Sequence, residues 1–500
     1  MTMRLNRKNL ETLAGKAAIP RYDRGALVPR IVHLGLGHFH RAHQALYLDE
    51  LIARGLTDAG IFEINLVEDP YPLGEIAGEQ DYLYTLISRG AGGEETIRVI
   101  GSILGYLNAV KDGAEKALAR IAAPETSVLS LTVTEKGYCF DMASGEPAWD
   151  NPLLGRDLEN PGAPVTMPGF VAAALDLRRR TNGLPLTVMS CDNFPSNGRV
   201  LKTCVVSFCR KAWPDLAPWI EENVAFPLSM VDRITPATAP ETVQYLADKF
   251  GIDDRWPVCC EDFRQWVLED RFRLPGGSGD RPFQPGLLSR AGVQVVKEVE
   301  PYELMKIRLL NGSHSALSYP AWLLGHRGVA EAALDPLIGN FIRRHYMEEI
   351  TATLLPVEGI DLNVYKNTLL SRFSNKKIGD TVLRLAQDGS KKIPISILNP
   401  LIEAVKGGTG RRAIVLALAF WARFLDGTDE AGAPIPLDDP AGAAAAAAAK
   451  RARRDPGDFL QVIGVHGIGV NPFRELTAEF GEDLEKIYRL GTKKTLETFF

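Results

Sequence analysis

The feature that most constrains the fold is an apolar segment that runs into two glycines and then into a helical pattern. Ile31–Leu34 is a short run of strand-forming residues, Gly35 and Gly37 follow it, and Phe39–Ala53 repeats its apolar residues with helical spacing. Dinucleotide-binding folds use such a unit, because the turn lets the backbone approach a pyrophosphate and directs a helix N-terminus at it. His40 replaces the third glycine of the usual G-x-G-x-x-G pattern, so an ordinary strand-to-helix turn that binds no nucleotide is the alternative interpretation.

The next strand candidate ends in two acids. The apolar run at 61–67 leads into Glu68 and Asp69. In a dinucleotide fold, an acid at this strand end accepts hydrogen bonds from the adenosine ribose and repels a 2′-phosphate, which favours NAD over NADP. A solvated acidic strand end is the alternative.

Strand and helix patterns continue to alternate along the first 200 residues. Further strands are predicted at 96–103, 127–135 and 184–193, and a helix is predicted at 167–180. We therefore expect a mostly parallel sheet, with ligands beyond the carboxyl ends of its strands, where Thr134, Glu135, Asp192 and Asn193 fall. Ordinary turn chemistry is the alternative for the Asp-Asn pair.

The second half of the chain reads as helical. Helical patterns are predicted at 207–224, 240–250 and 261–272, and a loop rich in glycine and proline at 273–286 approaches a domain boundary. Later helical segments are predicted at 296–325, 330–355, 378–388, 398–424 and 472–499. The expected fold class is α/β, with a sheet-containing domain at 1–295 and a mainly helical domain at 296–500.

Composition restricts the partners and the compartment. The chain has 500 residues and a formal net charge of −5, without a long basic block, so neither nucleic acid nor an anionic membrane is an expected partner. Its six cysteines show no C-x-x-C pairing and are expected to be free thiols in a reducing compartment. The N-terminus has no apolar leader pattern, and Ala413–Ala422 is too short to span a bilayer. We expect a cytoplasmic protein that binds small molecules.

One segment of the helical half, KIRLLNGSH, carries groups suited to catalysis. On an α-helix, Lys306, Asn311, His314 and Glu303 fall on one side, together with apolar residues such as Leu310. Burial in an apolar wall disfavours the ammonium form of a lysine and lowers its pKa, which makes Lys306 a candidate general base. The alternative is a surface lysine, a helix asparagine and a core histidine bonded to a carbonyl.

Several motifs together resemble a known family. GLGHFHRAHQ, TEKGYC, VMSCDN, MVDRITP, FRQWVLEDRF and KIRLLNGSH are similar, in order and spacing, to motifs of the polyol-specific long-chain dehydrogenases, the mannitol 2-dehydrogenase family. That family also includes fructuronate reductases and arabinitol dehydrogenases. The resemblance covers about residues 20–430. It implies a Rossmann-type NAD domain, a mainly helical second domain, NAD as cofactor and no metal.

The resemblance also implies roles for individual residues. Lys306 matches the catalytic lysine, Asn311 and His314 match its partners, Glu303 matches a proton relay to solvent, and Asn193 matches a second amide that holds the reacting oxygen. Substrate contacts are implied for Asp232, Arg384 and Lys392. The cofactor-binding residues that we predict are Gly35, Gly37, Phe39, His40, Arg41, Glu68, Asp69, Thr134 and Glu135.

The expected activity is hydride transfer between a polyol and a ketose of the mannitol and fructose type, with Lys306 as the base. Motifs such as TEKGYC resemble fructuronate reductases as well, so a D-mannonate oxidoreductase is the alternative, with Arg384 or Lys392 as the cation for the uronate. A non-catalytic NAD-binding sensor or scaffold is a more distant alternative. His38, His40 and His43 have a spacing compatible with a metal site, but the resemblance places them at the nucleotide turn. The oligomeric state stays open.

Overall fold

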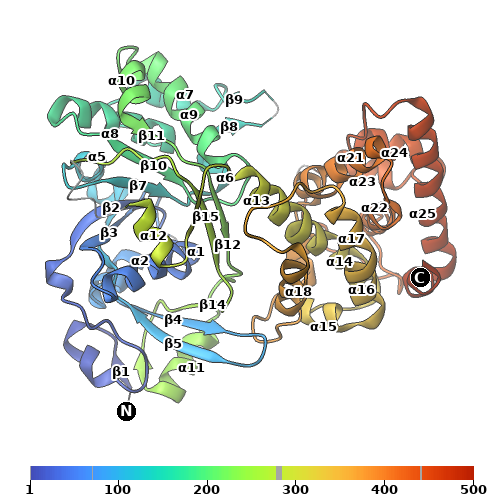
Figure 1. Cartoon of the computed structure of the whole chain (residues 1–500), viewed down its shortest axis with the longest axis horizontal. Helices are drawn as coiled ribbons and strands as arrows, with labels where there is room; N and C mark the ends of the chain where they lie inside the picture. The colour runs from blue at the N-terminus through green and yellow to red at the C-terminus, as the bar shows by residue number, and fades with distance from the viewer. Residues whose placement is uncertain (1, 70, 143, 277–283, 440–441, 500) are drawn as a thin grey trace. The chain divides into compact units, whose positions relative to one another are not determined.

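The chain forms two compact units, Met1–Glu300 and Pro301–Phe500. The computed structural model describes residues 2–69, 71–142, 144–276, 284–439 and 442–499 (Figure 1). The division falls between Glu300 and Pro301, compared with the expected boundary between 295 and 296. Residues 277–283 of the glycine- and proline-rich loop predicted at 273–286 lie outside the described residues.

The main sheet of the first unit has six strands in the order β11-β10-β7-β2-β3-β6. These strands are β2 (Val28–Leu34), β3 (Ala59–Asn65), β6 (Ile103–Asn108), β7 (Val128–Leu131), β10 (Leu186–Ser190) and β11 (Val224–Ala225). All neighbouring pairs run parallel, as predicted. Leu34 of β2 pairs with Ile64 of β3 and Leu131 of β7, so these three strands end at one edge of the sheet.

Helices cover both faces of this sheet, which is why its strands are nearly continuous apolar runs. One buried cluster joins β2, β7 and β10 to α5 (Ala114–Ala122), α8 (Met167–Thr181) and α9 (Asn197–Ala212). A second cluster joins β2 and β3 to α1 (His38–Ala42) and α2 (Gln44–Ala53). The predicted α/β class is therefore confirmed, and Figure 1 shows the sheet between its helices.

Two sequence predictions in this unit were wrong. The strand predicted at 96–103 is split between β6 and β5 (Glu95–Ile100), and β5 pairs antiparallel with β4 (Tyr84–Arg89) in a separate sheet with β14 (Val258–Glu261). The helix predicted at 261–272 is instead strand β15 (Gln265–Glu269), between β12 (Ser229–Asp232) and β16 (Gln294–Val296). Gln265 to Leu268 are all buried, because neighbouring strands and the core cover them, and such a run has no helical stripe.

The remaining elements of the first unit are short, apart from α11. They are β1 (Met3–Arg4), η1 (Arg7–Leu13), η2 (Arg24–Ala26), α3 (Leu73–Glu79), α4 (Ala109–Asp112), α6 (Thr134–Gly137), β8 (Phe140–Asp141), β9 (Glu146–Pro147), α7 (Pro152–Glu159), α10 (Leu216–Asn223), α11 (Pro240–Phe250), β13 (Ile252–Asp253) and α12 (Pro285–Arg290). All six cysteines are free thiols, as predicted.

The second unit is helical, as predicted, and its described residues contain no strand. Its elements, starting with the helix at the boundary, are α13 (Glu300–Met305), η3 (Lys306–Asn311), α14 (Gly312–Leu323), α15 (Val329–Leu334), α16 (Pro336–Asn340), η4 (Phe341–Tyr346), α17 (Met347–Thr351), α18 (Leu362–Phe373), α19 (Val382–Ala386), α20 (Gly389–Ile393), η5 (Pro394–Leu398), α21 (Asn399–Gly407), α22 (Arg412–Leu425), α23 (Ala443–Ala449), α24 (Pro456–Val462) and α25 (Val470–Phe499). Helix α18 was missed by the sequence analysis.

The core of this unit forms around α22, which packs between α14 and α25. Every residue of α22 after its first is buried, which explains why its sequence is apolar all round. Among the described residues, no helix combines the length and the hydropathy that crossing a bilayer requires.

Candidate active site

The glycine turn after β2 accepts no side chain at its first position. Gly35 has φ of +108°, and a Cβ there would lie 2.3 Å from the backbone oxygen of Thr132. The Gly35 N–H donates to Ile64 O at 3.0 Å, and the Thr132 hydroxyl donates to Gly35 O at 3.2 Å. The turn is thus pinned to β3 and to the end of β7. Glycine at the first position thus lets the turn pack against the end of β7, and such glycine turns are typical of dinucleotide-binding folds.

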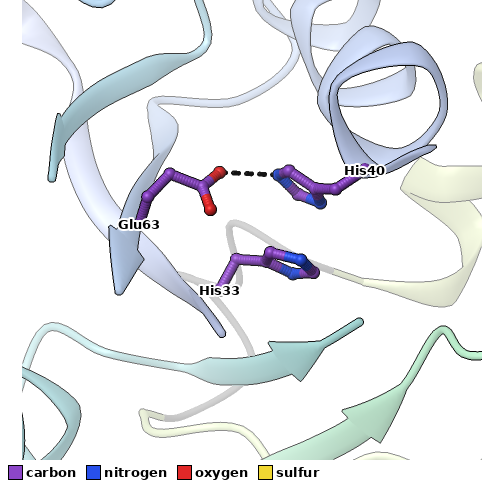
Figure 2. A group of neighbouring side chains, drawn as sticks. All are labelled: His33, His40 and Glu63. Carbon is purple, nitrogen blue, oxygen red and sulfur yellow. Dashed lines mark ion pairs between the residues drawn. The ribbon is translucent and has the colours of Figure 1, made fainter. Parts of the chain in front are cut away.

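His40, at the third position of the motif, is buried beneath this turn. Its Nε2 lies 2.7 Å from Oε1 of Glu63 in β3, and its ring stacks on His33 of β2 with centroids 3.5 Å apart and 17° between the planes (Figure 2). All three side chains are fully buried. We interpret His40 as a residue that holds α1 against the sheet through its contacts with Glu63 and His33.

The same three residues offer ligand atoms within 4.8 Å of one another, but their geometry is not that of a metal centre. A metal lies in the plane of each imidazole that binds it. Two nearly parallel rings stacked at 3.5 Å cannot both point at one ion. The nitrogens of His33 are also engaged, Nδ1 at 2.8 Å from the Ser130 hydroxyl and Nε2 at 2.9 Å from that of Thr132.

The other two histidines of the motif differ from His40, which contacts the Glu63 carboxylate. Nε2 of His43 donates to Gln265 O at 2.9 Å, and burial lowers the pKa of His43 to about 3. Burial lowers the pKa of His38 to about 4. Phe39 stacks on His43, and Arg41 is buried with its guanidinium over the ring of Trp256. These contacts give His43 and Arg41 structural partners outside the turn, in β15 and at Trp256.

The acids predicted at the end of β3 lie next to the glycine turn. Asn65 connects them, because its Oδ1 accepts from Leu36 N–H at 2.9 Å and its Nδ2 donates to Asp69 Oδ1 at 2.6 Å. The Tyr106 hydroxyl donates to the same carboxylate at 2.6 Å and 2.7 Å. Asp69 is half-buried and Glu68 is exposed. An acid held at this point fits the adenosine ribose of a dinucleotide.

Asp192 organises the ends of β7 and β10. Its carboxylate accepts from Val133 N–H at 3.0 Å, from Thr134 N–H at 2.9 Å and from the Tyr138 hydroxyl at 2.7 Å. Burial raises the pKa of Asp192, although these hydrogen bonds oppose that shift. Thr134 has φ of +63°, a strained value for a residue other than glycine, and the Asp192 carboxylate holds it there. Asn193, the predicted amide, follows directly and is exposed.

Glu135, predicted to bind cofactor, is exposed in the short helix α6. Asp232, predicted to contact substrate, is the buried last residue of β12. Glu135 follows the carboxyl end of β7 in the parallel sheet, where ligands bind in open sheets of this kind, whereas Asp232 ends a strand that pairs antiparallel with β15. The sequence placed Asp192 at this edge of the sheet, but it did not predict that its carboxylate accepts hydrogen bonds from Val133 and Thr134.

Lys306 begins a π-helical segment, which corrects the α-helical spacing assumed from the sequence. The run α13, η3 and α14 is continuous, but η3 bonds each N–H to the carbonyl five residues earlier, and Gly312 N–H bonds to Ile307 O in this way. This spacing places Asn311 above Lys306. Insertions of this kind are common at functional sites.

The segment is held tightly against its neighbours. A Cβ on Gly312 would lie 2.6 Å from the Tyr346 hydroxyl and 2.9 Å from Ser396 O, so the asparagine-glycine pair allows η3 to pack against two other helices. Lys306 is 3% exposed. The Oδ1 of Asn311 is buried and has no hydrogen-bond partner among the described residues. A buried acceptor without a partner is costly, which is typical of a functional position.

The other polar groups predicted for this segment lie close by in the sequence and are fixed by the same helix. Glu303 is buried one turn before Lys306, on α13. His314 is half-buried on α14, and its ring lies 4.6 Å from that of Phe373 on α18. The structure therefore places the predicted lysine, amide, imidazole and carboxylate on one rigid helical run.

The two predicted cations of this unit are both engaged. Arg384 makes a two-pronged ion pair with Asp380, in which Nε donates to Oδ1 at 2.6 Å and Nη2 contacts Oδ2. This pairing raises the pKa of Arg384. Lys392 donates from Nζ to Gln387 O at 2.6 Å and to Leu385 O at 3.5 Å, and burial lowers its pKa.

Comparisons with known proteins identify the family of both units. Residues 29–276 match the family model described as mannitol dehydrogenase Rossmann domain, and residues 298–488 match the mannitol dehydrogenase C-terminal domain. The chain is 43% identical over 424 residues to D-mannonate oxidoreductase of Escherichia coli, covering 85% of each chain. It is 39% identical over 502 residues to mannitol 2-dehydrogenase of Phaeosphaeria nodorum, covering 100% of this chain and 86% of that one.

A solved structure also resembles the whole chain. Mannitol 2-dehydrogenase of Pseudomonas fluorescens, in a ternary complex with NAD and D-mannitol, matches with a TM-score of 0.84 and 38% identity over 99% of both chains. The two family models together cover most of the sequence, and the similarity extends over both units. The chain therefore belongs to the mannitol dehydrogenase family of oxidoreductases.

Proposed function

We propose that the protein is an NAD-dependent, metal-independent dehydrogenase that interconverts a polyol and a ketose of the mannitol and fructose type. The observation that carries this proposal is the buried Lys306 on a π-helical segment, with the buried amide oxygen of Asn311, which has no hydrogen-bond partner in the described part of the chain, at the next turn. The P. fluorescens relative, whose structure holds NAD and D-mannitol, supports the same assignment.

NAD would be held by the glycine turn and by the acids at the end of β3. Gly35 packs against Thr132, whereas a Cβ on Gly37 would meet no atom closer than 3.9 Å, so the backbone at Gly37 could meet a pyrophosphate; α1 begins directly after it. Asp69, positioned by Asn65 and Tyr106, would accept hydrogen bonds from the adenosine ribose together with Glu68. When bound, NAD accepts the hydride from the carbinol carbon.

Lys306 would act as the general base during oxidation. Loss of hydride leaves positive character on the carbinol carbon, and this is stabilised when the hydroxyl proton leaves to a neutral amine. Burial disfavours the ammonium form of a lysine, and Lys306 is buried. In the reverse direction the protonated lysine returns the proton to the carbonyl oxygen.

Two side-chain amides would stabilise the negative charge that develops on the substrate oxygen. Asn311 and Asn193 carry N–H donors that do not titrate near neutral pH; Asn311 ends η3 and Asn193 directly follows Asp192. His314 would orient the same oxygen, and Glu303 would pass the proton from Lys306 to solvent. Asp232, Arg384 and Lys392 would contact the remaining hydroxyls of the substrate.

A D-mannonate oxidoreductase is the second candidate, because the E. coli relative carries that name. A uronate or aldonate substrate requires a cation for its carboxylate, and Lys392 has no carboxylate partner among its described contacts. The sensor alternative is less favoured, because Lys306, Asn311, His314 and Asn193 are all present. We favour the polyol.

The direct test is NADH formation by the purified protein with D-mannitol, D-arabinitol, D-sorbitol and D-mannonate, each at several concentrations. We expect the largest kcat/KM with a polyol. A kcat/KM that is larger with D-mannonate than with any of the three polyols would favour the D-mannonate oxidoreductase. NADH binding without oxidation of any of the four substrates would favour the sensor.

A further inference from the structure

The ion pair between Arg384 and Asp380 bears on which substrates the protein can accept. Asp380 precedes the first turn of α19, and its Oδ1 also accepts from Thr381 N–H at 2.8 Å. The Asp380 side chain is 8% exposed, whereas that of Arg384 is 53% exposed. The carboxylate is therefore the more buried partner, and it holds one edge of a guanidinium on a half-exposed side chain.

This arrangement changes what Arg384 can recognise. A guanidinium has five N–H donors and binds a carboxylate best through a two-pronged edge. Asp380 occupies the edge formed by Nε and Nη2 and cancels the positive charge. The remaining N–H groups can still donate to neutral hydroxyls. A substrate carboxylate would have to share the guanidinium with Asp380, and like charges at such distances repel.

Lys392 could supply the positive charge that Asp380 cancels on Arg384 only by giving up hydrogen bonds that stabilise the end of α19. Its ammonium donates to the carbonyls of Gln387 and Leu385, which lie at and just beyond the C-terminal end of α19. Cations at this end of a helix are stabilising, because they satisfy carbonyls that the helix leaves open. A substrate carboxylate would compete with these bonds.

We propose that Asp380 is a specificity-determining residue, which neutralises Arg384 and so selects uncharged polyols and ketoses over substrates that carry a carboxylate. The inference rests on the proposed function, in which Arg384 contacts the substrate. It names a residue that the comparison with relatives does not assign. Removal of the Asp380 charge would release a guanidinium edge for a carboxylate.

The experiment compares kcat/KM for D-mannitol and D-mannonate, with NAD, in the native protein and in Asp380→Asn. Asparagine keeps the size of the side chain and an oxygen for Thr381 N–H but removes the charge. We expect the ratio of mannonate to mannitol efficiency to rise on the order of tenfold. The matched control is Glu485→Gln, because Glu485 makes a similar two-pronged pair with Arg453 on the surface. The ratio of mannonate to mannitol efficiency in Glu485→Gln should equal that of the native protein.

The outcomes separate this inference from the proposed function. An unchanged or lower ratio in Asp380→Asn overturns the inference, as does a native preference for D-mannonate. If the native protein oxidises none of the proposed polyols, the proposed function itself has failed. A melting temperature and an NADH affinity close to those of the native protein verify that Asp380→Asn is folded. Should it not fold, Asp380→Ser, which retains an oxygen for Thr381 N–H, provides the same comparison.

Discussion

Replacement of Gly35 by alanine is expected to damage both the fold and cofactor binding. The new Cβ would lie 2.3 Å from Thr132 O, a backbone atom, while contacts of 3.4 Å or more are ordinary. Thr132 cannot retreat, because its N–H bonds to Leu34 O at 2.9 Å. The φ of +108° adds strain of about 1–3 kcal/mol, and the overlap adds about 1–3 kcal/mol. We expect a total destabilisation of about 2–6 kcal/mol, partly relieved by displacement of the turn.

Two measurements on Gly35→Ala test this reasoning. Its melting temperature should fall by several degrees. Its NADH dissociation constant, measured by fluorescence titration, should rise at least about tenfold, because the displaced turn carries the backbone that meets the pyrophosphate. Gly78→Ala is the control: Gly78 is exposed in α3 with no atom within 4 Å of a Cβ, so alanine there should stabilise by about 0.5–1 kcal/mol. Native melting and native NADH affinity in Gly35→Ala would refute the argument.

Further predictions concern the chemistry. Lys306→Ala should lower turnover by about 10²- to 10⁴-fold while NADH binding is kept, because the lysine acts on the substrate hydroxyl; near-native turnover would contradict its role as base. Prolonged treatment with EDTA should leave activity unchanged, and activity that is lost and then restored only by zinc would reverse this expectation. The native protein should prefer NAD to NADP, and Glu68→Gln combined with Asp69→Asn should narrow that preference, as measured by the two kcat/KM values; a native preference for NADP would remove these acids from the cofactor site.

The parallel sheet was predictable because its strands are marked locally. Ile31–Leu34 and its glycines, the acids at 68–69 and the run at 184–193 each combine an apolar core segment with polar residues at one end. Burial on both faces gives such strands an apolar sequence that stands out. By contrast, 261–272 mixes charged and apolar residues, and its central part is a strand only because β12 and β16 lie beside it. That pairing is decided by residues distant in the sequence.

The sequence predicts the groups of the candidate site but not the contacts that support them. Lys306 and Asn311 belong to one short motif, yet the π-helical turn that stacks them depends on packing against Tyr346 and Ser396. Asp192 and Asp380 act through contacts that the sequence does not disclose, although each lies near a predicted residue. His40 was expected at the nucleotide turn. Its burial against Glu63 results from the packing of β3 beside the turn, which the motif alone does not show.

The most direct test of the account is the pH dependence of kcat/KM in both directions for the native protein. Oxidation needs Lys306 as the neutral amine, and reduction needs it protonated. Oxidation should therefore rise with pH on one ionisation to a plateau below the ordinary lysine value of about 10.4, and reduction should fall through a comparable ionisation. Glu303→Ala should slow proton release without abolishing hydride transfer in a single turnover. If both directions share the same pH limb, Lys306 is not the base.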